Sequence, residues 1–300
     1  MVSGQDDSYA VLEINGGIGK SIMATGVCRA YAQAHPQRRL LVVTAYPEVF
    51  LNNPHVYRVF RSGSTPYFYD DYVCDRSTEF LLAEPYRHEG YLRQDRHLIE
   101  TWCQANAIPY TVAECYGTSL HLTPREIQLT RNMFTRSKPV LVFQPHGGAR
   151  EQGHKYSWNR DIPPHQAAKI VTAVSDRYHV IQPVHNNQQP VTPGAEPLTL
   201  GLRDLFGLVL VANKVLGIDS CVQHIAAALR KPAVVCWVTN SPTVFSYDIH
   251  TNIKPAARMV DRCSIDAYIH QYDFAGGRQY DYPFETEDVF SITEIVKTLL

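Results

Sequence analysis

Apolar residues along this chain fall into short runs that alternate with segments of helical periodicity. The first run, residues 9–14, ends at a glycine turn and predicts a buried strand. Residues 18–34 then place their apolar side chains on one helical face, and His35-Pro36 ends this predicted helix. A second apolar run follows at 40–43. Strand, turn, helix and strand form a βαβ unit, which predicts a parallel sheet.

The same alternation returns in the second half of the chain, after a polar stretch. Residues 52–78 are irregular and rich in aromatic side chains, and a helix is predicted at 97–107. The later predicted strands are 140–143, 179–181, 215–218 and 233–237, with helices at 164–178 and 221–229. Periodicity alone assigns residues 206–212 neither to helix nor to strand. We therefore predict an α/β fold with two domains, residues 1–135 and 136–287, which suits a length of 300 residues.

Composition narrows the class of protein. Hydrophobic residues make up 45% and charged residues 19%, and no apolar run reaches the roughly 18–20 residues that span a bilayer. The polar start of the chain does not resemble a secretory signal. The seven cysteines are scattered, with neither a Cys-x-x-Cys pair nor zinc-ligand spacing. We expect a cytoplasmic protein with reduced thiols and no metal or other cofactor.

Charge argues against one class of partner. Lys and Arg total 28 against 29 Asp and Glu, so bulk charge does not favour attachment to nucleic acid. A local basic cleft remains compatible with a balanced total.

The glycine turn at residues 15–21, with the sequence NGGIGKS, stands where the first strand becomes a helix. A P-loop would require glycine at position 14, where Ile14 stands, so an ATPase is a minor alternative. The glycines could also serve only to pack strand against helix. We favour a turn that faces substrate between the domains, because open α/β sheets bind ligands at such places. Its acceptor-binding residues would be Asn15, Gly16, Gly17, Gly19 and Lys20.

Three segments carry further glycines and polar residues. Residues 16–25 read GGIGKSIMAT; residues 146–148 read HGG and are followed by KYSW at 155–158; and residues 216–232 read LGIDSCVQHIAAALRKP. In this order they resemble the motifs of glycosyltransferase family nine, the heptosyltransferases that extend lipopolysaccharide. The third segment is the most specific, because it is close to that family's signature G-x-D-[ST]-G-x-x-H-x-A-A-A-L-x-x-P.

The resemblance implies a GT-B fold, in which two Rossmann-like domains face each other across a cleft. Residues 206–212 would then be helical, and a C-terminal helix within 288–300 would pack back onto the first domain. It also implies an inverting, metal-independent transfer of a sugar from a nucleotide-diphosphate donor to a hydroxyl. The donor-binding residues would be His146, Gly147, Gly148, Lys155, Asp219, Ser220, Cys221 and His224. A strand that delivers residues 219–220 to a helix N-terminus suits a diphosphate on independent grounds.

The general base is harder to assign. Lys20 stands where the family has its aspartate, and a lysine does not abstract protons at neutral pH unless burial lowers its pKa strongly. We expect Lys20 to bind an anion at the catalytic centre. Glu89 is the favoured base and His97 the second candidate; the further candidates are Asp70, Asp71 and Glu100.

Two further departures from the family pattern concern the donor. Cys221 replaces the signature glycine, and residues 182–185 lack the glycines and glutamate expected to hold a ribose. They indicate a divergent branch, bacterial or viral, with its own donor and acceptor.

Several functions remain open. The leading one transfers a sugar to a lipopolysaccharide or another surface glycan. A second glycosylates a hydroxymethylated base of viral DNA, through a basic cleft and stacking tyrosines. The residues for that cleft would be Arg58, Arg61, Arg87, Arg93 and Arg96, with Tyr67, Tyr69 or Tyr91. A third is a non-catalytic protein that binds sugar nucleotides.

Overall fold

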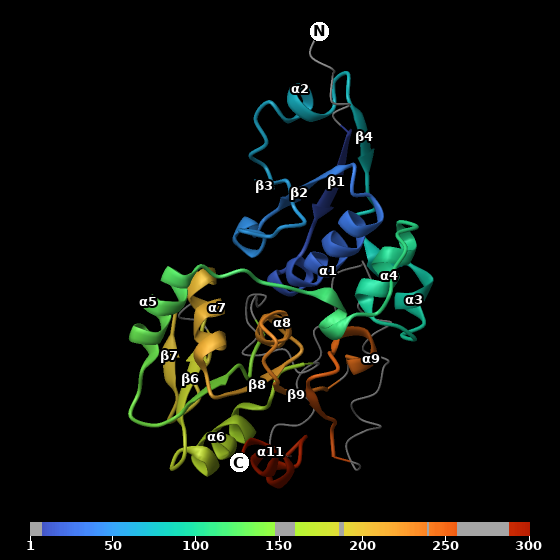
Figure 1. Ribbon diagram of the computed structural model, residues 1–300. Helices are drawn as coiled ribbons and strands as arrows, with labels where there is room; N and C mark the ends of the chain where they lie inside the picture. Colours follow the sequence, from blue (N-terminus) through green and yellow to red (C-terminus); the bar gives the residue numbers. More distant parts are fainter. Residues whose placement is uncertain (1–7, 148–159, 186–188, 239, 257–287) are drawn as a thin grey trace. The chain divides into compact units, whose positions relative to one another are not determined.

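The computed structural model describes residues 8–147, 160–185, 189–238, 240–256 and 288–300 (Figure 1). The chain forms two compact units, Met1–Leu122 and Thr123–Leu300, each built on its own parallel sheet. In the part of the chain that is described, no helix has the length and apolar character needed to cross a membrane.

The first unit contains a four-stranded sheet in the order β3-β2-β1-β4. Its strands are β1 (Ser8–Ile14), β2 (Arg39–Thr44), β3 (Arg58–Arg61) and β4 (Ser77–Phe80), all paired in parallel. Helix α1 (Ile18–Ala34) connects β1 to β2, which confirms the βαβ unit predicted from the sequence. Because β2 and β4 flank β1 on opposite sides, the carboxyl end of β1 is a topological switch point.

The two faces of this sheet are covered differently. On one face, Ala10, Leu12 and Ile14 are fully buried on the side of α1, which packs against α4 (Leu98–Ala105). On the other face, an aromatic cluster that includes α2 (Phe68–Tyr72) covers the amino-terminal part of β1. The shorter helices of this unit are η1 (Pro47–Val49), η2 (Pro85–Arg87), α3 (Glu89–Leu92) and η3 (Glu114–Gly117).

The second unit contains a six-stranded sheet in the order β10-β9-β8-β5-β6-β7. The strands are β5 (Val140–Phe143), β6 (His179–Pro183), β7 (Glu196–Leu198), β8 (Lys214–Ile218), β9 (Val234–Cys236) and β10 (Thr251–Ile253), all paired in parallel. The helices are α5 (Pro124–Phe134), α6 (Pro164–Val174), α7 (Leu202–Val211), α8 (Cys221–Ala228), α9 (Pro242–Phe245) and α11 (Ile292–Leu299). Strand β5 lies between β6 and β8, so the chain reverses direction across the sheet at β5. Helix α7 includes the ambiguous run 206–211 and confirms its assignment as helix.

The boundary between the units lies earlier than the predicted 135/136. Thr123 begins α5 with a capping box, in which its backbone N–H donates to Glu126 Oε2 at 2.7 Å. Helix α5 packs against α7, where Arg203 donates to both carboxylate oxygens of Glu126 at 2.7 and 2.8 Å. These contacts assign α5 to the second unit.

The C-terminal helix also differs from the expectation that it returns to the first domain. Helix α11 packs on α6 and β9 of the second unit, where Ile295 and Leu299 join the core. The buried Gln166 of α6 donates to Phe290 O at 2.6 Å, and Tyr178 Oη donates to Leu299 O at 2.7 Å. Buried hydrogen bonds and apolar contacts thus fix this helix to the second sheet.

Candidate functional site

The predicted donor residues that the structure describes gather at the carboxyl ends of β5 and β8. Gln144 follows β5 and joins the two strands: its backbone N–H donates to Leu216 O at 2.9 Å. Its side-chain oxygen accepts from Val222 N at 3.2 Å, and its amide donates to Cys221 Sγ at 3.5 Å. One buried glutamine therefore fixes the start of α8 beside the end of β5, at the switch point of the sheet.

Gly147 packs closely against the side chain of Arg160. Its N–H donates to Asp161 Oδ1 at 2.8 Å, and its carbonyl accepts from Gln189 Nε2 at 2.6 Å. A Cβ at this position would lie 2.5 Å from the Arg160 guanidinium. The neighbouring His146 is buried, with Nδ1 3.7 Å from Asp161 Oδ2. The loop after β5 is thus closely packed against an arginine whose side chain is 33% exposed.

Asp219 directly follows β8 and is surrounded by polar side chains. Its carboxylate accepts from Asn240 Nδ2, and from Gln223 Nε2 at 3.5 Å. Burial raises the pKa of Asp219, while the Asn240 hydrogen bond and the Arg160 charge act in the opposite direction. Arg160 also opposes the burial that raises the pKa of the Cys221 thiol. The guanidinium therefore lies within electrostatic range of both Asp219 and Cys221.

His224 is a neutral member of a buried network. Burial, with a smaller contribution from His250, lowers its pKa to about 3. Its Nδ1 lies 2.9 Å from Tyr247 Oη, and its Nε2 lies 3.9 Å from Asp219 Oδ1. The imidazole is therefore placed close to Asp219, but it carries no charge near neutral pH that could bind a phosphate.

The remaining predicted donor residues fall into two groups. Ser220 is the N-cap residue of α8; its hydroxyl makes no capping hydrogen bond and instead hydrogen-bonds with the Cys221 thiol. Cys221 is the first residue of the helix and is half-buried. Gly148 and Lys155 lie outside the described residues.

Lys20 is not the free cation that the sequence suggested. It is 5% exposed, and its Nζ lies 2.9 Å from Glu84 Oε2. The same ammonium group lies 5.0 Å from the ring centre of Tyr86 and 5.3 Å from that of Trp102. Its charge is paired within the unit, because the chain after β4 brings a carboxylate to the first turn of α1.

The glycine turn before α1 remains open to a ligand. Asn15, Gly16 and Gly17 are exposed, and Gly19 is half-buried. Gly16 has φ +108°, a conformation that glycine adopts readily, and a Cβ there would lie 3.3 Å from Lys20 Cδ. The turn thus closes over the lysine and does not present it to a phosphate, which disfavours the ATPase alternative.

The two candidate bases are held in other contacts. Glu89 begins α3, is 67% exposed at its side chain and pairs with Arg93 at 2.5 Å. His97 is buried at the N-cap of α4, where Nδ1 accepts from Ile99 N at 3.2 Å. Its ring stacks on Tyr116 with the ring centres 3.7 Å apart. Glu89 and His97 thus lie at the starts of two different helices, and among the described contacts none joins them.

Two charged residues that sequence reasoning passed over stand out. Arg160 lies beside Gly147 and Asp219, as described above. Glu13 lies at the carboxyl end of β1, is exposed, and its carboxylate has no hydrogen bond or ion pair within the described parts of the chain. A strand residue followed by a glycine turn was the available signal for Glu13.

Known proteins resemble this chain in structure but not detectably in sequence. No family model and no curated protein matches the sequence. Among solved structures, a family 9 glycosyltransferase from Veillonella parvula DSM 2008 is 12% identical, with 98% of this chain and 96% of that one covered and a TM-score of 0.64. The E. coli heptosyltransferase WaaC with ADP is 12% identical over 89% of this chain and 100% of that one, with a TM-score of 0.57.

A third structure is the iron-containing dodecameric glycosyltransferase TibC from enterotoxigenic E. coli H10407. It is 14% identical, with 82% of this chain and 62% of TibC covered and a TM-score of 0.58. At such identities the likeness establishes the fold. The chain has the GT-B fold.

One solved structure that shares the fold, TibC, is described as iron-containing. In the described ranges of this chain, no group of three His, Cys, Asp or Glu side chains is placed to hold a metal ion. The expectation of a metal-independent protein stays a prediction.

The basic residues suggested for DNA are largely neutralised in this GT-B chain. Three of the five arginines pair with carboxylates, which reduces the charge available to phosphates, and a fourth donates to a tyrosine hydroxyl. These pairs are Arg61 with Glu48, Arg93 with Glu89, Arg96 with Asp95, and Arg58 with Tyr72. Of the tyrosines, Tyr67 and Tyr69 are exposed whereas Tyr91 is buried.

Proposed function

We propose that this chain is a glycosyltransferase that moves a sugar from a nucleotide-diphosphate donor to a hydroxyl of a glycan, with inversion and without a metal. The observation that carries the proposal is the cluster of polar and charged groups at the switch point of the second sheet. There Gly147, Arg160 and the N-terminus of α8 meet, next to Asp219. A glycine packed against a cation and the N-terminus of a helix together are suited to bind a diphosphate, although one amide of this helix, Val222 N, already donates to Gln144.

The same groups can also stabilise the nucleotide diphosphate as it leaves the sugar. When the sugar leaves the donor, negative charge grows on the terminal phosphate of the nucleotide. A partly exposed guanidinium and a helix N-terminus can stabilise that charge without reorganising. Ser220, whose hydroxyl makes no capping hydrogen bond, can turn from the Cys221 thiol and donate to a phosphate oxygen. Lys155 stays a predicted second cation for the same diphosphate.

The nucleotide and acceptor are inferred by analogy and by charge. Solved structures that share the fold contain ADP or ADP-D-β-D-heptose, so an ADP-sugar is the first donor to examine. A glycan acceptor is favoured over DNA because most of the arginines that would form a basic cleft are already paired. We place the protein in the cytoplasm, where nucleotide sugars are made.

A binding experiment tests the proposal. Thermal shift and calorimetry with ADP-, UDP-, GDP- and CMP-sugars, each with and without EDTA, should show one EDTA-insensitive ligand. Replacing Arg160 with methionine should weaken it about 10- to 100-fold, the cost of about 1.5–3 kcal/mol for a charged hydrogen bond.

Lys169→Met removes a matched surface cation, which pairs with Asp288 at 3.0 Å, and should leave binding unchanged. Equal affinity of the Arg160 variant and the parent protein would refute this assignment of the donor site.

A further inference from the structure

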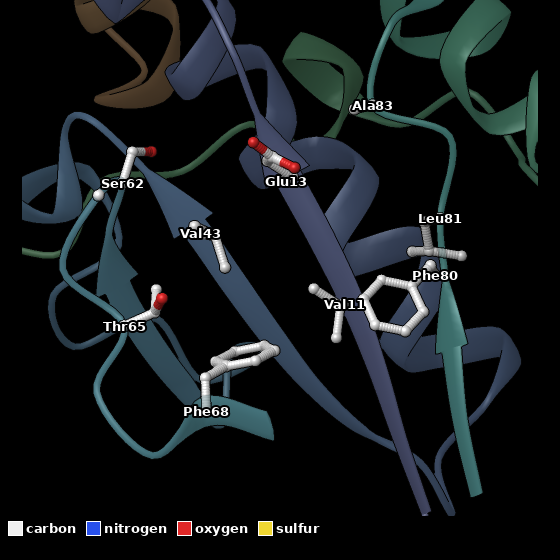
Figure 2. Close-up of a pocket in the computed structure, with 10 residues that line it drawn as sticks. Val11, Glu13, Val43, Ser62, Thr65, Phe68, Phe80, Leu81 and Ala83 are labelled. Atoms are coloured by element: carbon white, nitrogen blue, oxygen red, sulfur yellow. The ribbon is translucent and has the colours of Figure 1, made fainter. Parts of the chain in front are cut away.

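The first unit contains a cavity on the face of its sheet opposite α1. It has a volume of about 410 Å³, within the range of small-molecule sites. Figure 2 shows Val11, Glu13, Val43 and Phe80 on this face, with Phe68 extending toward them from the side of α2. The remaining lining residues are Ser62, Gly63, Thr65, Leu81 and Ala83.

The cavity occupies the switch point of this sheet. Glu13 pairs in register with Val43 of β2, and Val11 pairs with Phe80 of β4, so strands on both sides of β1 contribute walls. The side chains of these residues share one face because residues two apart in a strand do so. Ligands of open α/β sheets bind at the carboxyl ends of the strands around such a point.

The lining has one charge. Six of the ten residues are apolar, Ser62 and Thr65 provide hydroxyls, and Glu13 is the only ionisable side chain among the ten. Because no lining residue is cationic, an anionic ligand is disfavoured. A neutral ligand that places a hydroxyl on the carboxylate and a C–H face on Phe68 or Phe80 is favoured.

We propose that Glu13 is the general base of the transfer and that the cavity holds an uncharged glycoside acceptor; this inference rests on the proposed function. Glu13 accepts the proton of the acceptor hydroxyl as that oxygen forms a bond to the anomeric carbon. The bond between the anomeric carbon and the diphosphate oxygen breaks, and the nucleotide diphosphate leaves with the electron pair. The carboxylate is free of internal partners in the described chain, so no ion pair must be broken first.

The acceptor pocket should be separable from the base by kinetics. Glu13→Gln keeps the size of the side chain but removes the basic oxygen, and it should lower kcat for transfer about 10²- to 10⁴-fold. Val43→Phe fills the cavity beside Glu13 and should raise the KM for acceptor while kcat changes little. Both variants should bind the donor nucleotide sugar as the parent protein does, because that site lies in the other unit.

The assay uses the full chain, the nucleotide sugar selected by the binding panel, and a set of neutral 4-nitrophenyl glycosides as acceptor probes. Glu48→Gln changes a half-buried carboxylate on η1 that pairs with Arg61 at 2.7 Å; it is the matched control and should transfer normally. Circular dichroism and donor binding verify that each variant is folded.

The outcomes separate the two proposals. Absence of nucleotide-sugar binding in the parent protein refutes the proposed function itself. Donor binding with normal transfer by Glu13→Gln, or with transfer lost in Glu89→Gln instead, overturns Glu13 as the base. Donor binding and donor hydrolysis without transfer to any neutral glycoside overturns the acceptor class.

Discussion

The buried histidine pair of the second unit makes stability depend on pH. His224 and His250 are both buried, and burial lowers their pKa values to about 3 and about 4. In the unfolded chain each would have its ordinary pKa of about 6.5. As the pH falls below 6.5, the two histidines bind protons in the unfolded state but stay neutral in the folded state. The stabilisation is therefore fully present above pH 6.5 and is lost as the pH falls towards 3.

The magnitude follows from the pKa values. pH 5 lies about 1.5 units below the pKa of a histidine in the unfolded chain. Protonation then stabilises the unfolded state by about 2 kcal/mol per histidine. The pair should therefore lower the free energy of unfolding by about 4 kcal/mol between pH 7 and pH 5. Replacing His224 with glutamine should remove about half of this difference. Asp219, whose pKa is raised by burial, acts in the opposite direction, because in the folded state it binds a proton more readily than in the unfolded chain.

Urea denaturation at pH 7, 6 and 5 measures this difference. Trp237 is buried in the second unit and Trp102 in the first, so tryptophan fluorescence follows the unfolding of both units, and far-UV circular dichroism checks for a second transition. His224→Gln lowers stability at every pH, because the buried Tyr247 loses a partner; the change between pH 7 and pH 5 is the informative quantity. Val171→Ala, which shortens a buried apolar side chain in the same unit, is the matched control. An equal dependence on pH in the histidine variant and the control would refute the reasoning.

Two further predictions concern the packing of α5 on α7. Gly207→Ala would place a Cβ 2.2 Å from Thr130 Oγ1 and should cost about 1–3 kcal/mol in urea denaturation; adding Thr130→Ala should restore part of the loss, and no recovery would contradict the clash. Arg203→Met should cost about 1–3 kcal/mol, because it removes two hydrogen bonds from Glu126, whereas Lys169→Met on the surface should cost less than about 1 kcal/mol; equal losses would contradict this ranking.

Much of the fold could be predicted because the strands that carry the core are strongly apolar. Residues 140–143 form β5 as predicted, and residues 18–34 form α1. The short edge strands β7 and β10 have three residues each, too few for a pattern to emerge. Helix α5 was hidden by its polar composition, although its capping-box residues were present in the sequence.

The candidate site was predicted only where a motif marked it. In the segment 216–232, Asp219 directly follows β8 and His224 lies in α8, but their buried surroundings are formed by distant residues such as Tyr247. Lys20 pairs with Glu84, which lies 64 residues further along the chain, and no local sequence pattern predicts such a pair. Glu13 lies within the apolar run 9–14, which the sequence pattern marks only as a strand.

The measurement that tests the central claim most directly is release of nucleotide diphosphate from a panel of nucleotide sugars, with and without a glycoside acceptor. The account predicts that one donor is consumed in the presence of EDTA, that acceptor accelerates the reaction, and that Arg160→Met is strongly impaired. The product should have the anomeric configuration opposite to that of the donor. Absence of donor consumption, together with hydrolysis of ATP that requires magnesium, would contradict the account.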